Sequence, residues 1–379
     1  MKNSNPIIHI IYPNYMAKNG QGMSVGGIQT YLTNLIELIL VKGLKVHLYQ
    51  TADFDFSVNR ESVNIYAYKV KQGANISKFL YNKCKSFLKK NDIIIFGTDF
   101  QVIKTDCKKV IGIQHGISWD IPNYQVSNPH KFLKEYCRKA YNAWKRVKCI
   151  SHANSIICVD YNFVNWYRAI VPLKQTELIV IPNFTSIPVP RFQRNEKNNI
   201  VRIIFARRFF AYRGTRLFAN VVERILHKYA QVEVTFAGEG PDEAYIRKKF
   251  ESNKRVIITK YNSDDSIAIH MKHDIAVIPT IGSEGTSLSL LEAMASNCAV
   301  VCSNVGGMSN IVLDGFNGLM FDPYNEDELY IAIDRLVEDS ELRYRLSEQA
   351  YATVKTAFSL DKWKDKWSKV IDKFIMDIN

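Results

Sequence analysis

The stretch that decides the fold runs Pro279-Thr280-Ile281-Gly282-Ser283-Glu284-Gly285-Thr286-Ser287-Leu288-Ser289-Leu290-Leu291-Glu292-Ala293-Met294-Ala295. The apolar run before it, residues 275–278, predicts a buried strand, and apolar residues recur at helical spacing in its second half. The Gly-Thr-Ser step at 285–287 supplies a flexible turn and hydroxyls suited to capping a helix. The first backbone N–H groups of that helix have no partner within it and face the end of the strand, which predicts an anion site.

Two glutamates bracket this predicted site. Glu284 lies in the loop before the helix, and Glu292 lies eight residues later, about 12 Å along a helix axis. Helical side chains lean towards the N-terminus, so Glu292 can face whatever the amides hold. Carboxylates accept hydrogen bonds from sugar hydroxyls and from a ribose diol. The pattern therefore suggests a nucleotide-sugar whose diphosphate lies on the helix N-terminus.

With Gly306-Gly307 and Asn317-Gly318-Leu319, this stretch resembles the donor-site signature of retaining GT-B glycosyltransferases of family 4, the glycosyl transferases group 1. In that family, seven residues separate two glutamates. The resemblance implies an α/β fold of GT-B architecture, two Rossmann-like domains facing each other across a cleft. It implies that a hexosyl group passes from a nucleotide-sugar to an acceptor hydroxyl with retention at the anomeric carbon. Glu284 would contact the donor sugar, Glu292 the ribose, and the amides of Gly285, Thr286, Ser287 and Leu288 the diphosphate.

The same resemblance implies two cations that hold the diphosphate. The family has an arginine at a strand end and a Lys-Gly step five residues later. By that spacing Arg208 matches the arginine and Arg213 the lysine, while Arg207 stands where the family has glycine. The alternative is that both arginines are ordinary surface residues.

Further positions are carried over from the family one at a time. Gly26 and Gly27 resemble its Gly-Gly loop, which approaches the donor phosphates and the acceptor, although a Gly-Gly pair alone is only a turn. His115 follows an apolar strand, where the family has a histidine near the reacting groups; the alternative is a loop histidine bonded to a carbonyl. Gly238 begins a Gly-x-Gly-Pro turn, and Tyr261 would lie near the base.

The length of 379 residues suits two domains. Six short apolar runs predict the strands of an acceptor-binding Rossmann-like domain over residues 1–183. A Pro-containing stretch without periodicity, 185–199, predicts a linker. The family resemblance implies that residues 184–359 form the donor-binding domain and that a helix over 360–379 crosses back to pack on the first domain.

Composition limits the class of protein. Hydrophobic residues make up 47%, as in globular proteins, and no apolar run is long enough to span a bilayer. The first residues lack the features of a signal peptide, so we expect a cytoplasmic protein. The cysteines and histidines lack metal spacing, so we expect no metal site and no cofactor beyond the donor substrate.

The net charge of +13 belongs to the first half, since residues 1–180 hold 24 Lys and Arg against 11 Asp and Glu. Cations alternate with aromatic and apolar residues over Lys78–Lys90 and Lys131–Lys148. Such helices suit the headgroup region of an anionic membrane. The alternative is two helices that pack on the sheet with solvated lysines outside, and both interpretations can hold.

The acceptor is therefore expected to be a glycan or a lipid-linked sugar, handled at the inner face of the cell membrane in bacterial surface polysaccharide biosynthesis. A nucleotide-sugar epimerase of the same fold is the rival enzyme; it would turn over a donor without an acceptor. A basic nucleic-acid-binding protein is the rival of another class, but no nucleic-acid module is recognised and the cations lie away from the signature. We expect no nucleic-acid partner.

Overall fold

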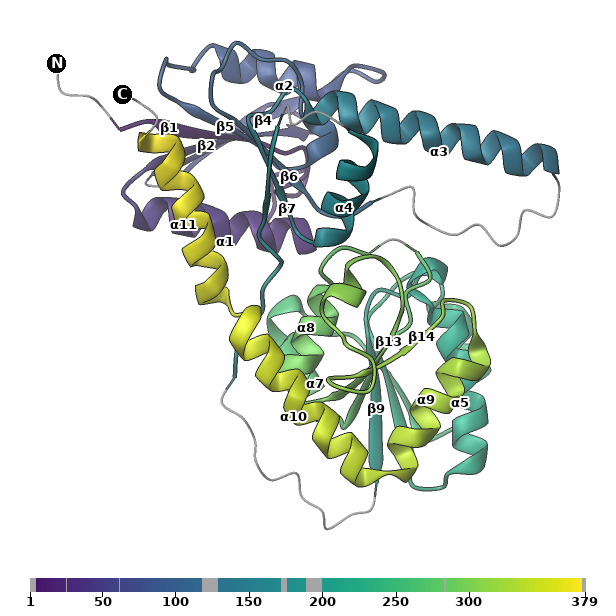
Figure 1. Ribbon diagram of the computed structural model, residues 1–379. Coiled ribbons are helices and arrows are strands. Elements are labelled where there is room, and N and C mark those ends of the chain that lie inside the picture. The colour runs from purple at the N-terminus through teal and green to yellow at the C-terminus, as the bar shows by residue number, and fades with distance from the viewer. Residues whose placement is uncertain are drawn as a thin grey trace. The chain divides into compact units, whose positions relative to one another are not determined.

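The computed structural model describes residues 5–24, 26–60, 62–117, 129–171, 176–188, 200–282 and 284–376 (Figure 1). These residues form two compact units. The first contains the described residues up to His115, those from 129 to Pro182, and the end of the chain from Trp363. The second contains Gly116, Ile117 and the described residues from Asn183 to Lys362.

The first unit is built on an eight-stranded sheet with the order β3-β4-β2-β1-β5-β6-β7-β8. Its strands are β1 (Ile7–Ile11), β2 (Lys45–Ala52), β3 (Phe56–Arg60), β4 (Val63–Lys69), β5 (Ile93–Phe96), β6 (Val110–Gln114), β7 (Ser155–Cys158) and β8 (Glu177–Val180). Only β3 pairs antiparallel. The central strands are apolar at nearly every position because a parallel sheet is covered on both faces.

The helices of this unit are α1 (Gly27–Val41), α2 (Ile76–Lys85), α3 (Pro129–Ile150), α4 (Tyr161–Ile170) and most of α11 (Leu360–Met376), with a 3-10 turn η1 (Asp99–Gln101). β1 is a switch point of the chain order, because β2 lies on one side of it and β5 on the other. Ligands of open α/β sheets bind beyond the carboxyl ends of strands at such points.

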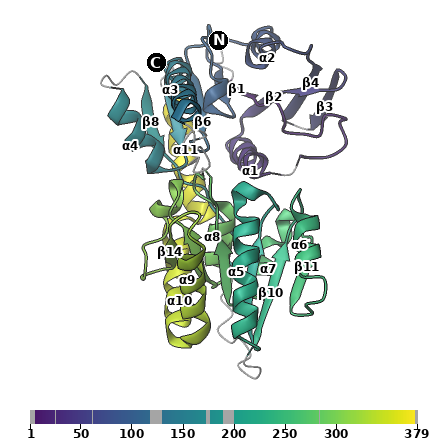
Figure 2. The same cartoon turned by 90° about the vertical axis from the view of Figure 1, so that its right-hand side faces the viewer.

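The second unit has a six-stranded parallel sheet with the order β11-β10-β9-β12-β13-β14, and Figure 2 shows β11 at one edge and β14 at the other. Its strands are β9 (Val201–Ala206), β10 (Val232–Ala237), β11 (Val256–Thr259), β12 (Ile275–Ile278), β13 (Ala299–Ser303) and β14 (Leu319–Phe321). Its helices are α5 (Thr215–Lys228), α6 (Glu243–Lys249), α7 (Ser266–His270), α8 (Leu288–Ala295), α9 (Glu326–Glu338) and α10 (Ser340–Ala357).

Alternation along β9 builds the core of this unit on both faces of the sheet. Ile203 and Phe205 pack in a cluster with residues of α5 and α9. Ile204 and Ala206 point the other way, into a cluster with residues of α8 and α10. Side chains of a strand alternate between faces, so one apolar run serves two cores. The switch point of this sheet lies at β9, with β10 on one side and β12 on the other.

The last helix, α11, packs on the first unit through an aromatic stripe. Trp363, Trp367 and Phe374 are buried. The indole Nε1–H of Trp367 donates to the hydroxyl of Tyr31 in α1 over 2.7 Å. Lys42 at the end of α1 contacts Asp372 over 2.6 Å. None of the described helices is both long and apolar enough to cross a membrane.

Trp367→Ala should therefore destabilise the first unit by about 3–5 kcal/mol, because it removes a fully buried indole and leaves Tyr31 without that hydrogen bond. Thermal unfolding followed by near-UV circular dichroism measures this. The matched control is Met376→Ala at the exposed end of the same helix, which should leave the transition near its wild-type temperature. Equal effects of the two changes would contradict the docking of α11.

Candidate functional site

The candidate site lies at the switch point of the second sheet, where the loops after β9 and β12 meet. Arg207 is the first residue after β9, and residues 279–287 lead from β12 to α8. Arg213 ends the 3-10 turn η2 (Ala211–Arg213) before α5. Parallel strands bring these loops to one edge, so residues about 70 positions apart in the chain become neighbours.

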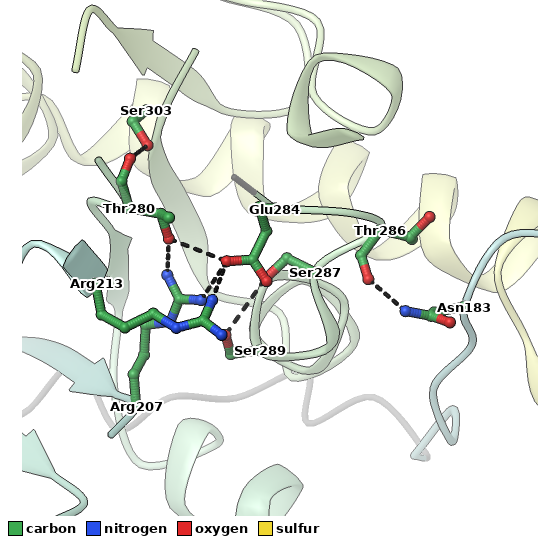
Figure 3. A network of polar contacts seen from close by, with 9 residues as sticks. All are labelled: Asn183, Arg207, Arg213, Thr280, Glu284, Thr286, Ser287, Ser289 and Ser303. Carbon is green, nitrogen blue, oxygen red and sulfur yellow. Dashed lines mark hydrogen bonds and ion pairs between the residues drawn. The ribbon is translucent and has the colours of Figure 1, made fainter. Parts of the chain in front are cut away.

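The Glu284 carboxylate is held by two arginines and a hydroxyl (Figure 3). Arg207 donates from Nη2 to Oε2 over 2.8 Å, Arg213 donates from Nη1 to the same oxygen, and Thr280 donates its hydroxyl over 3.2 Å. Arg207 also donates to the Thr280 hydroxyl oxygen. No described residue donates to Oε1, so this oxygen can accept a bond from a ligand.

The charged side chains of this cluster are largely shielded from solvent. The side chains of Arg207, Glu284 and Arg213 are 5%, 12% and 22% exposed. Burial alone would raise the pKa of Glu284, but the positive charges of Arg207 and Arg213 and their hydrogen bonds outweigh it and hold that pKa below its ordinary value. Burial lowers the pKa of Arg207. Two guanidinium groups and one carboxylate leave one net positive charge, which favours an anionic ligand.

Backbone contacts fix the loops that carry these charges. Gly306 has φ 53°, and a Cβ on it would lie 2.0 Å from the carbonyl oxygen of Glu284. The next residue, Gly307, donates its N–H to that oxygen over 2.8 Å. Gly238, with φ 146°, lies as close to Arg207, because a Cβ there would be 2.1 Å from its carbonyl oxygen. Only glycine permits both approaches.

The N-terminus of α8 begins next to Glu284. Ser287 is the N-cap residue, but its side chain does not cap the helix, so our expectation of hydroxyl capping by this residue was wrong. Its hydroxyl instead lies 3.4 Å from that of Ser289. The carbonyl of Thr286 accepts a bond of 2.7 Å from the Asn183 amide. Leu288 is the first helical residue, so its backbone N–H and the next two point out of the helix N-terminus, as the donors of an anion site do.

Glu292 lies one to two turns into α8 and contacts α7. It accepts a hydrogen bond of 2.5 Å from the hydroxyl of Ser266, and burial raises its pKa. Tyr261 is half-buried against the apolar cluster next to α8, and burial raises its pKa to about 12. His270 is buried and donates from Nδ1 to the Ser266 carbonyl over 2.7 Å. Burial lowers the pKa of His270 to about 4, so it is neutral at physiological pH.

The two neighbouring arginines lie differently from the sequence expectation. We expected Arg208 beside Arg213; the structure places Arg207 there, while Arg208 is exposed with its guanidinium 5.6 Å from the ring centre of Phe210. Consecutive side chains of an extended segment point to opposite sides, so a shift of one residue exchanges them. The spacing from Arg213 alone could not decide between the two; the position of Arg207 directly after the strand is the signal that favours it.

His115, Gly26 and Gly27 belong to the first unit. His115 follows β6 and donates from Nε2 to the carbonyl of Gly97 over 3.0 Å. Burial lowers the pKa of His115 to about 4, so Nδ1 carries no proton at neutral pH and can accept one. Gly26 is the N-cap residue of α1 and Gly27 its first residue, so the Gly-Gly step opens this helix.

Buried polar atoms without partners gather near His115. The side chains of Gln114 and Thr98 are both buried. Among the described residues, nothing forms a hydrogen bond with the side-chain amide nitrogen or oxygen of Gln114 or with the hydroxyl of Thr98. Gln114 ends β6, and Thr98 lies two residues after the end of the neighbouring strand β5. Unpaired buried polar groups are costly, so water or a polar ligand group is expected to meet them. Across the described part of the chain, no three His, Cys, Asp or Glu side chains are grouped as metal ligands would be.

Known proteins resemble this chain in sequence and in structure. The family model of glycosyl transferases group 1 matches residues 187–353. An uncharacterised glycosyltransferase of Methanocaldococcus jannaschii is 23% identical over 294 residues, which cover 74% of this chain and 72% of that protein. The matched family region contains the whole of the candidate site.

Two solved structures share the fold over nearly the whole chain. Sucrose-phosphate synthase from Thermosynechococcus elongatus has a TM-score of 0.76 at 14% identity and covers 98% of this chain and 100% of its own. TarM of S. aureus, crystallised with fondaparinux, α-GlcNAc-glycerol and UDP, has a TM-score of 0.70 at 13% identity and covers 97% and 99%. At these identities the likeness shows the fold alone.

Arg207→Met should destabilise the second unit by about 3–5 kcal/mol, because it removes one partner of a buried carboxylate. Arg208→Met is the matched control: the same change one residue later, at an exposed side chain, should cost less than about 0.5 kcal/mol. Thermal unfolding of both variants measures the difference. A larger loss for Arg208→Met than for Arg207→Met would overturn this arrangement of the site.

Acid should destabilise the second unit through His270. Its folded pKa of about 4 lies below the ordinary value, so the unfolded chain binds the proton first as the pH falls. The stability is therefore fully present above about pH 6.5 and declines towards pH 4, by at most about 1.4 kcal/mol per pH unit. His270→Gln should make that decline shallower in melting temperatures measured from pH 7 to 4.5. The same change at exposed His227 of α5 serves as control; an unchanged slope in His270→Gln would contradict the assignment.

Proposed function

We propose that this chain, a glycosyltransferase of group 1 with the GT-B fold, moves a hexose from a nucleotide-sugar to a hydroxyl of a glycan or lipid-linked acceptor, with retention at the anomeric carbon. The observation that carries the proposal is the Arg207–Glu284–Arg213 cluster beside the N-terminus of α8. It combines positive charge, fixed donors and a carboxylate oxygen that accepts from no described residue, at a sheet edge suited to ligands.

The donor diphosphate would bind where the positive charge is concentrated. Arg207 and Arg213 keep N–H groups that Glu284 does not use, and the first amides of α8 add donors. Glu284 Oε1 would accept from a hydroxyl of the donor sugar. Glu292 would accept from the ribose, with Ser266 holding its carboxylate in place. Tyr261, half-buried above the same helix, would lie near the base.

The reaction would proceed on one face of the sugar. The bond between the anomeric carbon and the diphosphate oxygen breaks and its electron pair leaves with the phosphate. The acceptor oxygen bonds to that carbon from the same side, and its proton passes to the leaving phosphate oxygen. Arg207 and Arg213 would stabilise the charge that develops there. Three donors on Oε2 make Glu284 a poor nucleophile, which supports this course over a covalent intermediate on that residue. We propose that these cations serve in place of a metal and that no cofactor takes part.

The acceptor would use the first unit. His115 is neutral with an open Nδ1, and the unpaired amide of Gln114 ends the same strand. Such groups suit the hydroxyls of a sugar. The Gly26-Gly27 step at the start of α1 would allow close approach of phosphate or acceptor. We propose that the protein works in the cytoplasm, at the inner face of the membrane, in bacterial surface polysaccharide biosynthesis.

The donor site is tested by thermal shift with UDP, GDP, ADP and dTDP, in wild type and in Glu292→Ala. One nucleotide at 100 times its Kd should stabilise the second unit by about 2.7 kcal/mol. Glu292→Ala should lose most of this shift, and Glu341→Ala, an exposed glutamate of α10, should keep it. If no nucleotide shifts the wild type, the proposed function fails. Turnover of the matching nucleotide-sugar without any acceptor would point to an epimerase instead.

A further inference from the structure

Helix α3 of the first unit carries an exposed apolar face. Leu133, Tyr136, Tyr141 and Trp144 are 58–63% exposed, and Cys137 is exposed as well. At 100° per residue these side chains, with the small Ala140, fall within an arc of roughly 140°. Figure 1 shows α3 running out beyond the sheet of its unit. A face of this size is rarely left to water on a protein that has no partner.

The rest of the helix surface is basic. Residues 133–150 hold six cations against one carboxylate, Glu135, which pairs with Arg138; of the six, Arg146 is turned to the unit and pairs with the buried Asp99 over 2.6 Å. Lys134 and Lys145 flank the apolar arc on one side. Lys148 lies 5.5 Å from the ring centre of Trp144, and Tyr141 lies against the same indole. Cations beside half-exposed Trp and Tyr rings are typical of the boundary between headgroups and acyl chains.

The other basic segment differs in its packing. In α2, Leu80, Tyr81 and Cys84 are buried within the unit. Lys83 covers the rings of Tyr68 and Phe79, and Lys85 pairs with Asp106 over 2.5 Å. The apolar side of α2 is therefore used within the fold, and its lysines are partly matched. Of the two segments that the sequence singled out, α3 exposes more apolar area: its four large apolar side chains are 58–63% exposed, whereas Ile76 and Phe87 of the α2 segment are each 41% exposed.

Charge decides between the possible occupants of this face. A second copy of α3 would bring its own lysines to the same place, and like charges at an interface are costly. An anionic bilayer matches the cations and takes the Trp and Tyr side chains without a fixed partner geometry. The proposal rests on the proposed function only in that a lipid-linked acceptor gives the docking a purpose.

We propose that α3 docks the protein on anionic membranes, with Leu133, Tyr136, Tyr141 and Trp144 inserted at the acyl boundary and the lysines at the headgroups. The helix lies in the plane of the interface and does not span it. α2 takes no direct part in this contact. Because vesicle binding needs neither donor nor sugar transfer, this inference and the proposed function can fail separately.

The test is flotation of the full-length protein with vesicles of phosphatidylcholine alone or rich in phosphatidylglycerol. The wild type should float only with the anionic vesicles, and added salt should weaken this. Each cation near such a surface contributes about fivefold to partitioning, so Lys134→Glu with Lys145→Glu should weaken it by roughly 30-fold or more. Tyr141→Ser with Trp144→Ser should abolish flotation. Lys78→Glu with Lys90→Glu in the α2 segment, the same change of net charge, should retain most of it.

Folding and competing occupants are checked in the same samples. The melting temperature of each variant should equal that of the wild type because the substituted side chains are exposed, and its shift by a bound nucleotide should be unchanged because the proposed donor site lies in the second unit. Flotation that is equal on neutral vesicles, or absent, overturns the proposal. The proposal is also overturned if Lys78→Glu with Lys90→Glu weakens flotation as much as Lys134→Glu with Lys145→Glu. A dimer that Trp144→Ser dissociates, or tight binding of duplex DNA at physiological salt, would assign the face to a second copy or to nucleic acid instead.

Discussion

The second unit depends on one buried carboxylate, that of Glu284, being held between two guanidinium groups. Taking three charges out of water is costly, and the cost is offset only while the geometry keeps every charge paired. Among the described residues, the three donors to this carboxylate all use the same oxygen, Oε2, so Oε1 can accept from a ligand, and the guanidinium N–H groups that Glu284 does not use can donate to one. A ligand with an anionic centre and a hydroxyl beside it would complete both. The site is therefore organised before a ligand arrives, which limits the reorganisation that binding requires.

The positions of these charged side chains are fixed by backbone contacts more than by side-chain packing. The loop carrying Glu284 is held by Gly306 and Gly307 from the segment after β13, and the loop carrying Arg207 is held by Gly238 from the turn after β10. Four loops at one sheet edge thus fix one another through carbonyl contacts that no side chain larger than hydrogen allows. The glycines of the signature consequently act on the charges indirectly. They fix the backbone positions of Arg207 and Glu284, and the long arginine side chain then reaches the carboxylate.

The sequence predicts most of this fold because buried parallel strands are continuous apolar runs, as in residues 201–206 and 275–278. The sequence does not predict an element whose apolar pattern is interrupted, which of two adjacent residues faces the site, or which face of a helix is exposed. The hairpin of β3 and β4 escaped prediction because Asn and Ser interrupt its apolar pattern. The choice between Arg207 and Arg208 depends on which side of an extended segment faces the site, and spacing within a motif does not encode that. The exposure of α3 was equally hidden, since an apolar stripe reads the same whether it packs on a sheet or remains open.

The two concentrations of positive charge differ in chemistry, and the difference follows from the residue types. Near Glu284 the cations are arginines, whose planar forks fix direction as well as charge. On α3 most are lysines on flexible stems, next to aromatic rings. In the second unit several surface cations are paired locally, as in the contact of Lys228 with Asp334 and of Lys249 with Glu223. A small anion such as a diphosphate needs fixed donors, whereas a lipid surface, whose headgroups move, needs charge and apolar area without fixed geometry.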